Sequence, residues 1–341
     1  MTLTNKIAIG TSCLGQSLIH NLSDKIHSAA SAGFQGLEIV YGDLERYCTS
    51  RNVSMVTAAQ QIRQLVDNLG LEILSLAPFE NFEGNTKTPL TERLKIASHW
   101  LDLARILGAP YLQIPSQYDA NNSTTDESVI VSEMQQLSDL AASSSPVIKL
   151  AYEPLSWGVV YSTWDDALRL VNLVNRDDFG LCVDTFHELT KLWASSFEKS
   201  GVYPDGPERL SSSLWRFVET IPIEKVFYVQ LSDAERFDPP FSKSHEWYIE
   251  GEAPEFTWSK HARPFPLEKE FGAYTPVLDV VRAWIVEAGF KGWVSMEIFD
   301  WRMRDADYGI GTAAERGWKS WGMVKEGAGV HGGDGNVKLQ L

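Results

Sequence analysis

Four apolar, strand-like segments in the second half of the chain end in a side chain that can bind a cation. The segments LAYEPL, LCVDTF, FYVQLSD and VSMEIF carry Glu153, Asp184, Gln230 and Glu297. Taken singly, each residue is more typical of a loop hydrogen-bond acceptor or a helix cap. Together, three carboxylates at one place would repel one another and raise one another's pKa. A divalent cation removes that repulsion, and an all-oxygen ligand set favours Mg²⁺ or Mn²⁺, with Co²⁺ as a further option, over zinc.

Further polar residues lie next to these segment ends. His187 follows Asp184 by three residues, at the start of a predicted loop. Alone it would be an ordinary solvated histidine, but beside a metal ligand it could contact substrate or transfer a proton. Glu38 and Tyr41 end the segment GLEIVY and point to offset faces, so we expect one of them to reach the same pocket.

Residues 234–275 form a long insertion that is rich in proline, aromatic, arginine and histidine residues. Loops of this length in compact domains are usually functional or disordered. The basic residues of the insertion include Arg236, His245, Lys260, His261 and Arg263. Such charges are normally exposed loop residues. Over the mouth of a negatively charged site, however, they favour recognition of a substrate carboxylate, which arginine binds with paired hydrogen bonds.

These side chains need a fold that brings strand ends together. Apolar runs alternate with amphipathic segments along the chain, at residues 6–12, 36–41, 71–78, 111–116, 147–154, 179–186, 226–233 and 292–299. Their nearly continuous apolar character suits parallel strands that are covered on their outer face. Eight strand–helix units predict an α/β fold of the (β/α)8 TIM barrel class, in which chemistry sits at the carboxyl ends of the strands. The competing doubly wound sheet would show GxGxxG after the first strand, and this chain has GTSCLGQS there.

The repeat also sets the domain boundaries. It predicts a single barrel domain over residues 1–325 that contains the insertion at about 234–275. The glycine-rich residues 326–341 have no helical period and are predicted to form a flexible tail. Within the barrel, Thr163 is expected to cap the start of a helix, and Gly33 is expected to end one.

Composition narrows the class of partner. The 341 residues carry a formal net charge of −15, which argues against non-specific binding to nucleic acid or to anionic membranes. No apolar run approaches the ~18 residues of a membrane span. The three cysteines are widely spaced without a CxxC pair, so neither a disulfide framework nor a zinc ribbon is expected. We therefore expect a soluble, cytoplasmic protein that acts on a small molecule, and homo-oligomer formation stays open.

Six segments together resemble the xylose isomerase-like TIM barrels and, among them, the fungal 3-dehydroshikimate dehydratases. The segments are PFENFEG (78–84), YEPLSW (152–157), FGLCVDTF (179–186), KVFYVQLSDAER (225–236), GAYTPV (272–277) and GWVSMEIF (292–299). The resemblance implies that the four strand-end residues named above are metal ligands, with Gln230 where many isomerases carry a histidine. Glu80 stands where bacterial relatives have a basic residue, and this directs the carboxylate assignment to Arg236 and Arg263.

The resemblance implies a hydro-lyase reaction of quinate and shikimate catabolism, the metal-dependent loss of water from 3-dehydroshikimate to give protocatechuate. Removal of the C4 proton beside the C3 ketone gives an enediolate, which a divalent ion stabilises as a Lewis acid. His187 is then the first candidate for the base, and His245 for the acid or a substrate ligand. Two other functions stay open. One is a metal-dependent sugar isomerase or epimerase of the same superfamily, and the other is a non-catalytic barrel that binds a metabolite.

Overall fold

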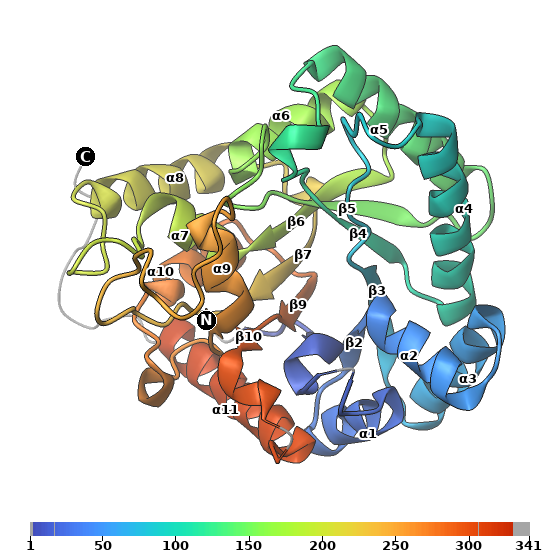
Figure 1. Ribbon diagram of the computed structural model, residues 1–341, viewed down its shortest axis with the longest axis horizontal. Coiled ribbons are helices and arrows are strands. Elements are labelled where there is room, and N and C mark those ends of the chain that lie inside the picture. The colour runs from blue at the N-terminus through green and yellow to red at the C-terminus, as the bar shows by residue number, and fades with distance from the viewer. Residues whose placement is uncertain (1–2, 17, 306, 330–341) are drawn as a thin grey trace.

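A closed barrel of eight parallel strands forms the centre of the protein (Figure 1). The computed structural model describes residues 3–16, 18–305 and 307–329. The strands follow one another around the barrel in chain order, which confirms the predicted fold, and each lies inside one of the eight predicted segments. They are β1 (Ile7–Gly10), β2 (Gly36–Val40), β3 (Glu72–Ala77), β4 (Tyr111–Pro115), β5 (Lys149–Glu153), β6 (Phe179–Asp184), β7 (Val226–Leu231) and β9 (Trp293–Met296).

Helices cover the outside of the barrel (Figure 1). They are α1 (Leu22–Ala32), α2 (Tyr41–Arg51), α3 (Met55–Asn68), α4 (Leu90–Leu107), α5 (Glu127–Ala142), α6 (Trp164–Val174), α7 (Thr185–Leu192), α8 (Gly206–Thr220), α10 (Val277–Val281), which continues as a π-helix (Arg282–Glu287), and α11 (Ile310–Gly329). The side chain of Thr163 accepts a hydrogen bond from Asp166 N and caps α6, as predicted. Gly33 ends α1 with a φ of 104°, which glycine adopts without a steric cost.

Two helices that directly follow barrel strands were not predicted, and both change the place of a candidate residue. Tyr41 is the first residue of α2 rather than the last residue of a strand. The predicted strand 179–186 is too long, because β6 ends at Asp184 and α7 begins at once. Asp184 Oδ1 accepts hydrogen bonds from the backbone N–H groups of Phe186 (2.7 Å) and His187 (3.3 Å), which caps α7. His187 therefore lies on the first turn of a helix and not in a loop.

The barrel interior is apolar in its middle and polar at the carboxyl ends of the strands. A buried cluster that includes Ala151, Cys182 and Tyr228 fills the inside of the barrel. Successive side chains of a strand point to opposite faces, so the residue two positions further along points inward again. Glu153 and Asp184 stand in that position above Ala151 and Cys182. The strand period thus places the polar residues in one layer on an apolar floor.

The insertion at 234–275 packs over the carboxyl ends of the strands. It contains α9 (Pro254–His261) and β8 (Ala262–Arg263), and β8 pairs antiparallel with β10 (Phe299–Asp300). Figure 1 shows α9 beside α7, and an edge-to-face contact between Trp258 and Phe186 joins the two helices. The insertion is therefore an ordered cover over one side of the barrel mouth.

The C-terminal helix is longer than predicted. Helix α11 continues to Gly329, past the predicted start of the tail at 326, and packs against α1. The rest of the predicted tail, 330–341, lies outside the described residues. In the described part of the chain, no helix combines the length and the apolar character that crossing a membrane requires.

Candidate active site

Three carboxylates meet at the carboxyl ends of the barrel strands. Glu153 ends β5, Asp184 ends β6, and Glu297 directly follows β9. One oxygen atom from each lies within 4.8 Å of the others. Gln230 on β7 is the neighbour of Asp184 in the sheet register, and its Nε2 donates to Glu297 Oε1 (3.2 Å). The structure thus brings the four predicted metal ligands together.

Arg263 of the insertion lies among these carboxylates. Its Nη2 donates to Asp184 Oδ2 and to Glu297 Oε2 (2.7 Å), and its Nε donates to Ser232 Oγ (2.7 Å). A weaker contact joins Nη1 to Ser259 Oγ (3.4 Å), so four of the five guanidinium N–H groups are used. We expected Arg263 to bind a substrate carboxylate. In the structure its guanidinium donates to two carboxylates of the protein.

One guanidinium does not balance the acids around it. Burial raises the pKa of Asp184 to about 7, against the opposing effect of Arg263. Burial also raises the pKa values of Glu153 and of Glu38, and the Glu297 carboxylate adds to both shifts. A bound divalent cation would supply the positive charge that this layer lacks and reverse these shifts.

The donor atoms fit a hard divalent cation. Glu153 Oε1 is buried and has no hydrogen-bond partner among the described residues, while its Oε2 accepts a hydrogen bond from Gln113 Nε2. An unpartnered buried oxygen calls for an explanation, and a cation beside three carboxylates provides one. Gln230 faces the other way, because its Oε1 accepts a hydrogen bond from Cys182 Sγ (3.1 Å). Binding a cation through that oxygen requires the amide to turn over.

Glu38 and Tyr41 occupy different places, in line with their offset faces. Glu38 is buried in the carboxylate layer, where Ser75 Oγ donates to its Oε2 (2.8 Å) and Gln230 Nε2 donates to its Oε1 (3.1 Å). Tyr41 stacks on Trp100 with 4.0 Å between ring centroids and lines a separate surface groove. Of the two, Glu38 is the residue that reaches the cavity described next.

His187 is buried against Glu153. The backbone N–H of Ser156 donates to its Nδ1 (3.2 Å), so the proton of the neutral ring lies on Nε2. Nε2 lies 3.3 Å from Glu153 Oε1, without the alignment of a hydrogen bond. Burial lowers the pKa of His187 to about 4. The imidazole is therefore neutral at pH 7, and its Nε2 lies on the side of the Glu153 carboxylate.

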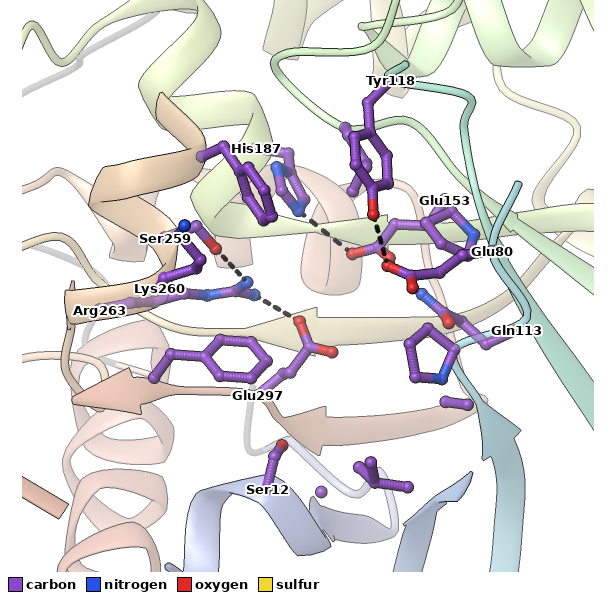
Figure 2. A pocket seen from close by; sticks show the side chains of 18 of the residues that line it. Ser12, Glu80, Gln113, Tyr118, Glu153, His187, Ser259, Lys260, Arg263 and Glu297 are labelled. Carbon is purple, nitrogen blue, oxygen red and sulfur yellow. Dashed lines mark hydrogen bonds and ion pairs between the residues drawn. The ribbon is translucent and has the colours of Figure 1, made fainter. Parts of the chain in front are cut away.

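A cavity of about 280 Å³ opens above this layer (Figure 2). Five of the predicted site residues line it, namely Glu38, Glu153, His187, Arg263 and Glu297. Figure 2 shows Ser259 and Lys260 on the same side as Arg263, with Glu80, Gln113 and Tyr118 on the opposite side. The other lining residues are small or apolar: Gly10, Ser12, Val40, Ala77, Pro78, Pro115, Leu155, Trp157, Phe256 and Phe299. The cavity therefore has a polar floor and largely apolar walls.

Sequence reasoning missed several residues of these walls. Glu80, noted from the sequence only for its difference from bacterial relatives, lies three residues beyond the end of β3, so the strand-end rule that found Glu153 did not select it. Tyr118 donates a hydrogen bond to Glu80 Oε1 (3.0 Å), and burial raises the pKa of Glu80. Phe256 of α9 stacks on Trp157, with 5.1 Å between ring centroids, and leans on Tyr118. No sequence signal pairs Phe256 with residues about a hundred positions away.

Arg236 and His245 lie away from the cavity. The Arg236 guanidinium is 3.7 Å from the Asp238 carboxylate, and 46% of its side chain is exposed. His245 packs against Phe237, Phe241 and Trp247, with ring centroids 5.0 to 5.1 Å apart. Neither belongs to the described residues that line the cavity. Of the three insertion residues chosen from the sequence, Arg263 is the one that the fold directs to the barrel mouth.

The fold and the strand-end carboxylates define an α/β barrel with a candidate metal site, and comparison with known proteins gives its family. The chain belongs to the xylose isomerase-like TIM barrel family, whose model matches residues 26–319. It is 34% identical over 337 residues to a 3-dehydroshikimate dehydratase of Neurospora crassa, and the match covers 94% of each chain.

Two further relatives are longer than this chain. A 3-dehydroshikimate dehydratase of Pseudomonas aeruginosa is 29% identical over 83% of this chain and 37% of its own length. Among solved structures, a xylose isomerase-like TIM barrel/4-hydroxyphenylpyruvate dioxygenase fusion protein superposes with a TM-score of 0.73 at 24% identity. That match covers 95% of this chain and 43% of the fusion protein. At this identity the structural match supports the barrel fold.

Proposed function

We propose that this protein is a metal-dependent hydro-lyase that converts 3-dehydroshikimate into protocatechuate. The observation that carries the proposal is the floor of the cavity, where Glu153, Asp184 and Glu297 bring carboxylate oxygens within 4.8 Å of one another. The full-length similarity to the Neurospora crassa dehydratase supports this choice of substrate. A cavity of about 280 Å³ has room for one substituted six-membered ring.

The chain's own residues would hold the metal and keep its ligands in place. Glu153, Asp184, Glu297 and, with its amide turned, Gln230 would bind one divalent cation, Mg²⁺ or Mn²⁺ in the first instance. When bound, the ion supplies Lewis acidity for the negative charge that develops on the C3 oxygen. Gln113 Nε2 donates to Glu153 Oε2 and thereby orients that ligand.

Proton transfer needs an acceptor for the C4 proton and a donor for the leaving C5 hydroxyl. The contacts of His187 favour a role other than the base that we expected, because its Nδ1 already accepts the Ser156 N–H and its pKa is lowered to about 4. We assign His187 Nε2 as a neutral hydrogen-bond donor to developing charge, the kind of role that a histidine of depressed pKa can fill.

The proton acceptor that we assign is Glu80. It lines the cavity outside the metal-binding set and its side chain is exposed to solvent, while partial desolvation by the surrounding protein raises its pKa, the direction that a base working near neutral pH requires. Tyr118 O–H holds one of its oxygens. A carboxylate that takes the C4 proton and gives it to the departing C5 hydroxyl balances the loss of one water. A further proton shift then makes the ring aromatic.

A sugar isomerase or epimerase of the same family is the alternative with a related metal site. Its substrate is a neutral polyol, whereas this cavity carries Lys260 on one wall and the aromatic side chains of Trp157, Phe256 and Phe299. Apolar and aromatic walls suit a flat ring better than a chain of hydroxyl groups. A metabolite-binding barrel without activity would bind the same ring and leave it unchanged.

We also propose that the protein works in the cytoplasm on free 3-dehydroshikimate of quinate and shikimate catabolism. Its three cysteines, Cys13, Cys48 and Cys182, are free thiols, and Cys13 and Cys182 are buried. Free thiols are typical of proteins from reducing compartments.

Conversion of 3-dehydroshikimate by the purified protein tests the proposal. We expect the ultraviolet absorbance of a catechol ring to appear with Mg²⁺ or Mn²⁺, to be lost in excess chelator, and to return when metal is restored. If no product forms with Mg²⁺, Mn²⁺ or Co²⁺, the dehydratase proposal is wrong. Interconversion of neutral ketoses by the same sample would instead favour the isomerase.

A further inference from the structure

We infer that Lys260 binds the carboxylate of the substrate, and that it does so by exchanging its ion pair with Glu252 for one with the ligand. The inference deepens the proposed function and rests on it, because it concerns the same cavity and the same anionic ring. It replaces the assignment of this carboxylate to Arg236 or Arg263.

Lys260 is the cavity-lining basic residue, among those described, whose charge is not bound into the carboxylate layer. Arg263 donates to Asp184 and Glu297, and the His187 ring lies against Glu153 with its Nδ1 accepting the Ser156 N–H. The Lys260 side chain is 31% exposed, and its ammonium lies 4.4 Å from the ring centroid of Phe256. The ammonium thus lies over an aromatic ring of the cavity wall on a side chain that is still partly exposed, so its charge is accessible to a ligand.

The present partner of Lys260 lies outside the cavity. Lys260 Nζ is 2.6 Å from Glu252 Oε2, and Glu252 Oε1 accepts a hydrogen bond from Thr257 Oγ1 (2.6 Å). Glu252 is not one of the residues that line the cavity. An ion pair between partly exposed groups contributes little free energy, so a ligand carboxylate can compete for the ammonium. Glu252 would keep its bond to Thr257 after the exchange.

A second cavity, of about 240 Å³, also has Lys260 in its wall. The single acid that lines it, Asp300, is bound by Arg302 and Arg316. Arg304 adds a positive charge to the same wall. Arg302 and Arg316 also pair with Glu235 and Glu268, so the charges around this wall balance in a protein of net charge −15. A ligand carboxylate at Lys260 therefore meets no excess of negative charge on this side.

Binding at Lys260 also gives the ring one orientation. Figure 2 shows Lys260 on the Arg263 side of the cavity and Glu80 on the opposite side. In the substrate ring the carboxylate is on C1, para to C4. A carboxylate on Lys260 therefore directs C4 toward Glu80, the proposed proton acceptor. The reverse orientation would place two carboxylates side by side, which is unfavourable.

Two ligands that differ by one carboxylate test the inference. Protocatechuate and catechol share the diol, and the binding of each to Mn²⁺-loaded protein can be followed by titration calorimetry. Lys260→Met should weaken protocatechuate binding by about 10- to 100-fold, the effect of losing a hydrogen bond between charged groups, and leave catechol binding unchanged. Glu252→Gln removes the competitor and should strengthen protocatechuate binding by about 2- to 5-fold. Arg236→Met, the matched control in the same insertion, should change neither constant.

Several outcomes would overturn the inference. If Lys260→Met weakens the binding of protocatechuate and of catechol by the same factor, or weakens neither, the residue does not contact the carboxylate. Weaker protocatechuate binding in Glu252→Gln would mean that the ion pair only holds α9 in place. Binding of these ligands needs no turnover. A parent protein that binds protocatechuate through Lys260 but leaves 3-dehydroshikimate unchanged would contradict the proposed function alone.

Discussion

Replacing Arg263 with methionine removes the positive charge between the buried Asp184 carboxylate and the partly buried Glu297 carboxylate, and it keeps much of the side-chain volume. Asp184 and Glu297 would then lie close together without a counterion. Breaking a buried ion pair by removing one partner costs about 3–5 kcal/mol of stability. An unfolding entropy of about 2.1 cal/mol/K per residue, summed over the 341 residues, converts this loss into a fall of about 4–7 °C in melting temperature.

A divalent cation should recover part of that loss, because it brings positive charge to the same oxygens. We therefore expect Mn²⁺ to raise the melting temperature of Arg263→Met more than that of the parent protein, relative to samples in chelator. Circular dichroism during heating measures the melting temperatures of both proteins, each in Mn²⁺ and in chelator. Arg236→Met is the matched control, because the Arg236 side chain is 46% exposed and distant from the layer. It should melt with the parent protein in both buffers.

The sign of the pH dependence provides a second check. Burial raises the folded-state pKa of Asp184 above its unfolded-state value, and loss of Arg263 removes the effect that opposes this rise. The loss of stability is then full above the folded-state pKa and disappears below the unfolded-state pKa, where both states are protonated. A deficit in Arg263→Met that is the same in chelator and in Mn²⁺, and that does not change with pH, would refute this reasoning. Arg263 would then contribute only packing and its hydrogen bond to Ser232.

Four shorter predictions follow from the same geometry. Glu153→Gln should abolish turnover and leave the far-ultraviolet circular dichroism unchanged; a variant that still turns over would contradict the metal proposal. His187→Gln keeps a hydrogen-bond donor and should retain more activity than His187→Ala, with an unchanged pH–rate profile; equal losses in both would indicate a base. Burial raises the pKa of Glu83 from 4.5 to about 7, so the ionised carboxylate destabilises the folded protein. This cost is absent below pH 4.5 and complete above pH 7. As the pH rises between these values, the unfolding free energy of Glu83→Gln, measured in urea, should therefore gain about 3 kcal/mol relative to that of the parent protein. Gly180→Ala places a Cβ 2.6 Å from the carbonyl oxygen of Lys225 and should cost about 1–3 kcal/mol, seen as a lower melting temperature; an unchanged value would show that the barrel adjusts.

The barrel and the acidic layer could be predicted because both depend on local periodicity. Runs of apolar residues mark the strands, and a period of two fixes which residue points inward at each strand end. Glu153, Asp184 and Glu297 follow from that rule without any tertiary information. The boundary between β6 and α7 could not be predicted in this way. Thr185 and Phe186 continue the pattern of the strand, although the Asp184 side chain already caps the helix.

The basic residues of the site could not be selected from the sequence. Their roles depend on how α9 and β8 pack, and that packing is set by aromatic contacts between distant segments. Arg263 reaches Asp184 across 79 positions of the chain. Arg236 points to Asp238 and His245 lies among aromatic rings, although both occur in equally promising sequence surroundings. Lys260 and Glu80 acquire a role only when the cavity is known.

Anomalous diffraction from crystals grown with Mn²⁺ tests the central claim, that the strand-end layer is a metal site, most directly. We predict one strong anomalous peak bounded by the carboxylates of Glu153, Asp184 and Glu297, with the Gln230 amide turned so that its oxygen faces the ion. Glu297→Gln crystals prepared in the same way should show a weaker peak or none. A parent crystal in saturating Mn²⁺ with no peak in this layer, or with the peak elsewhere, would contradict the account.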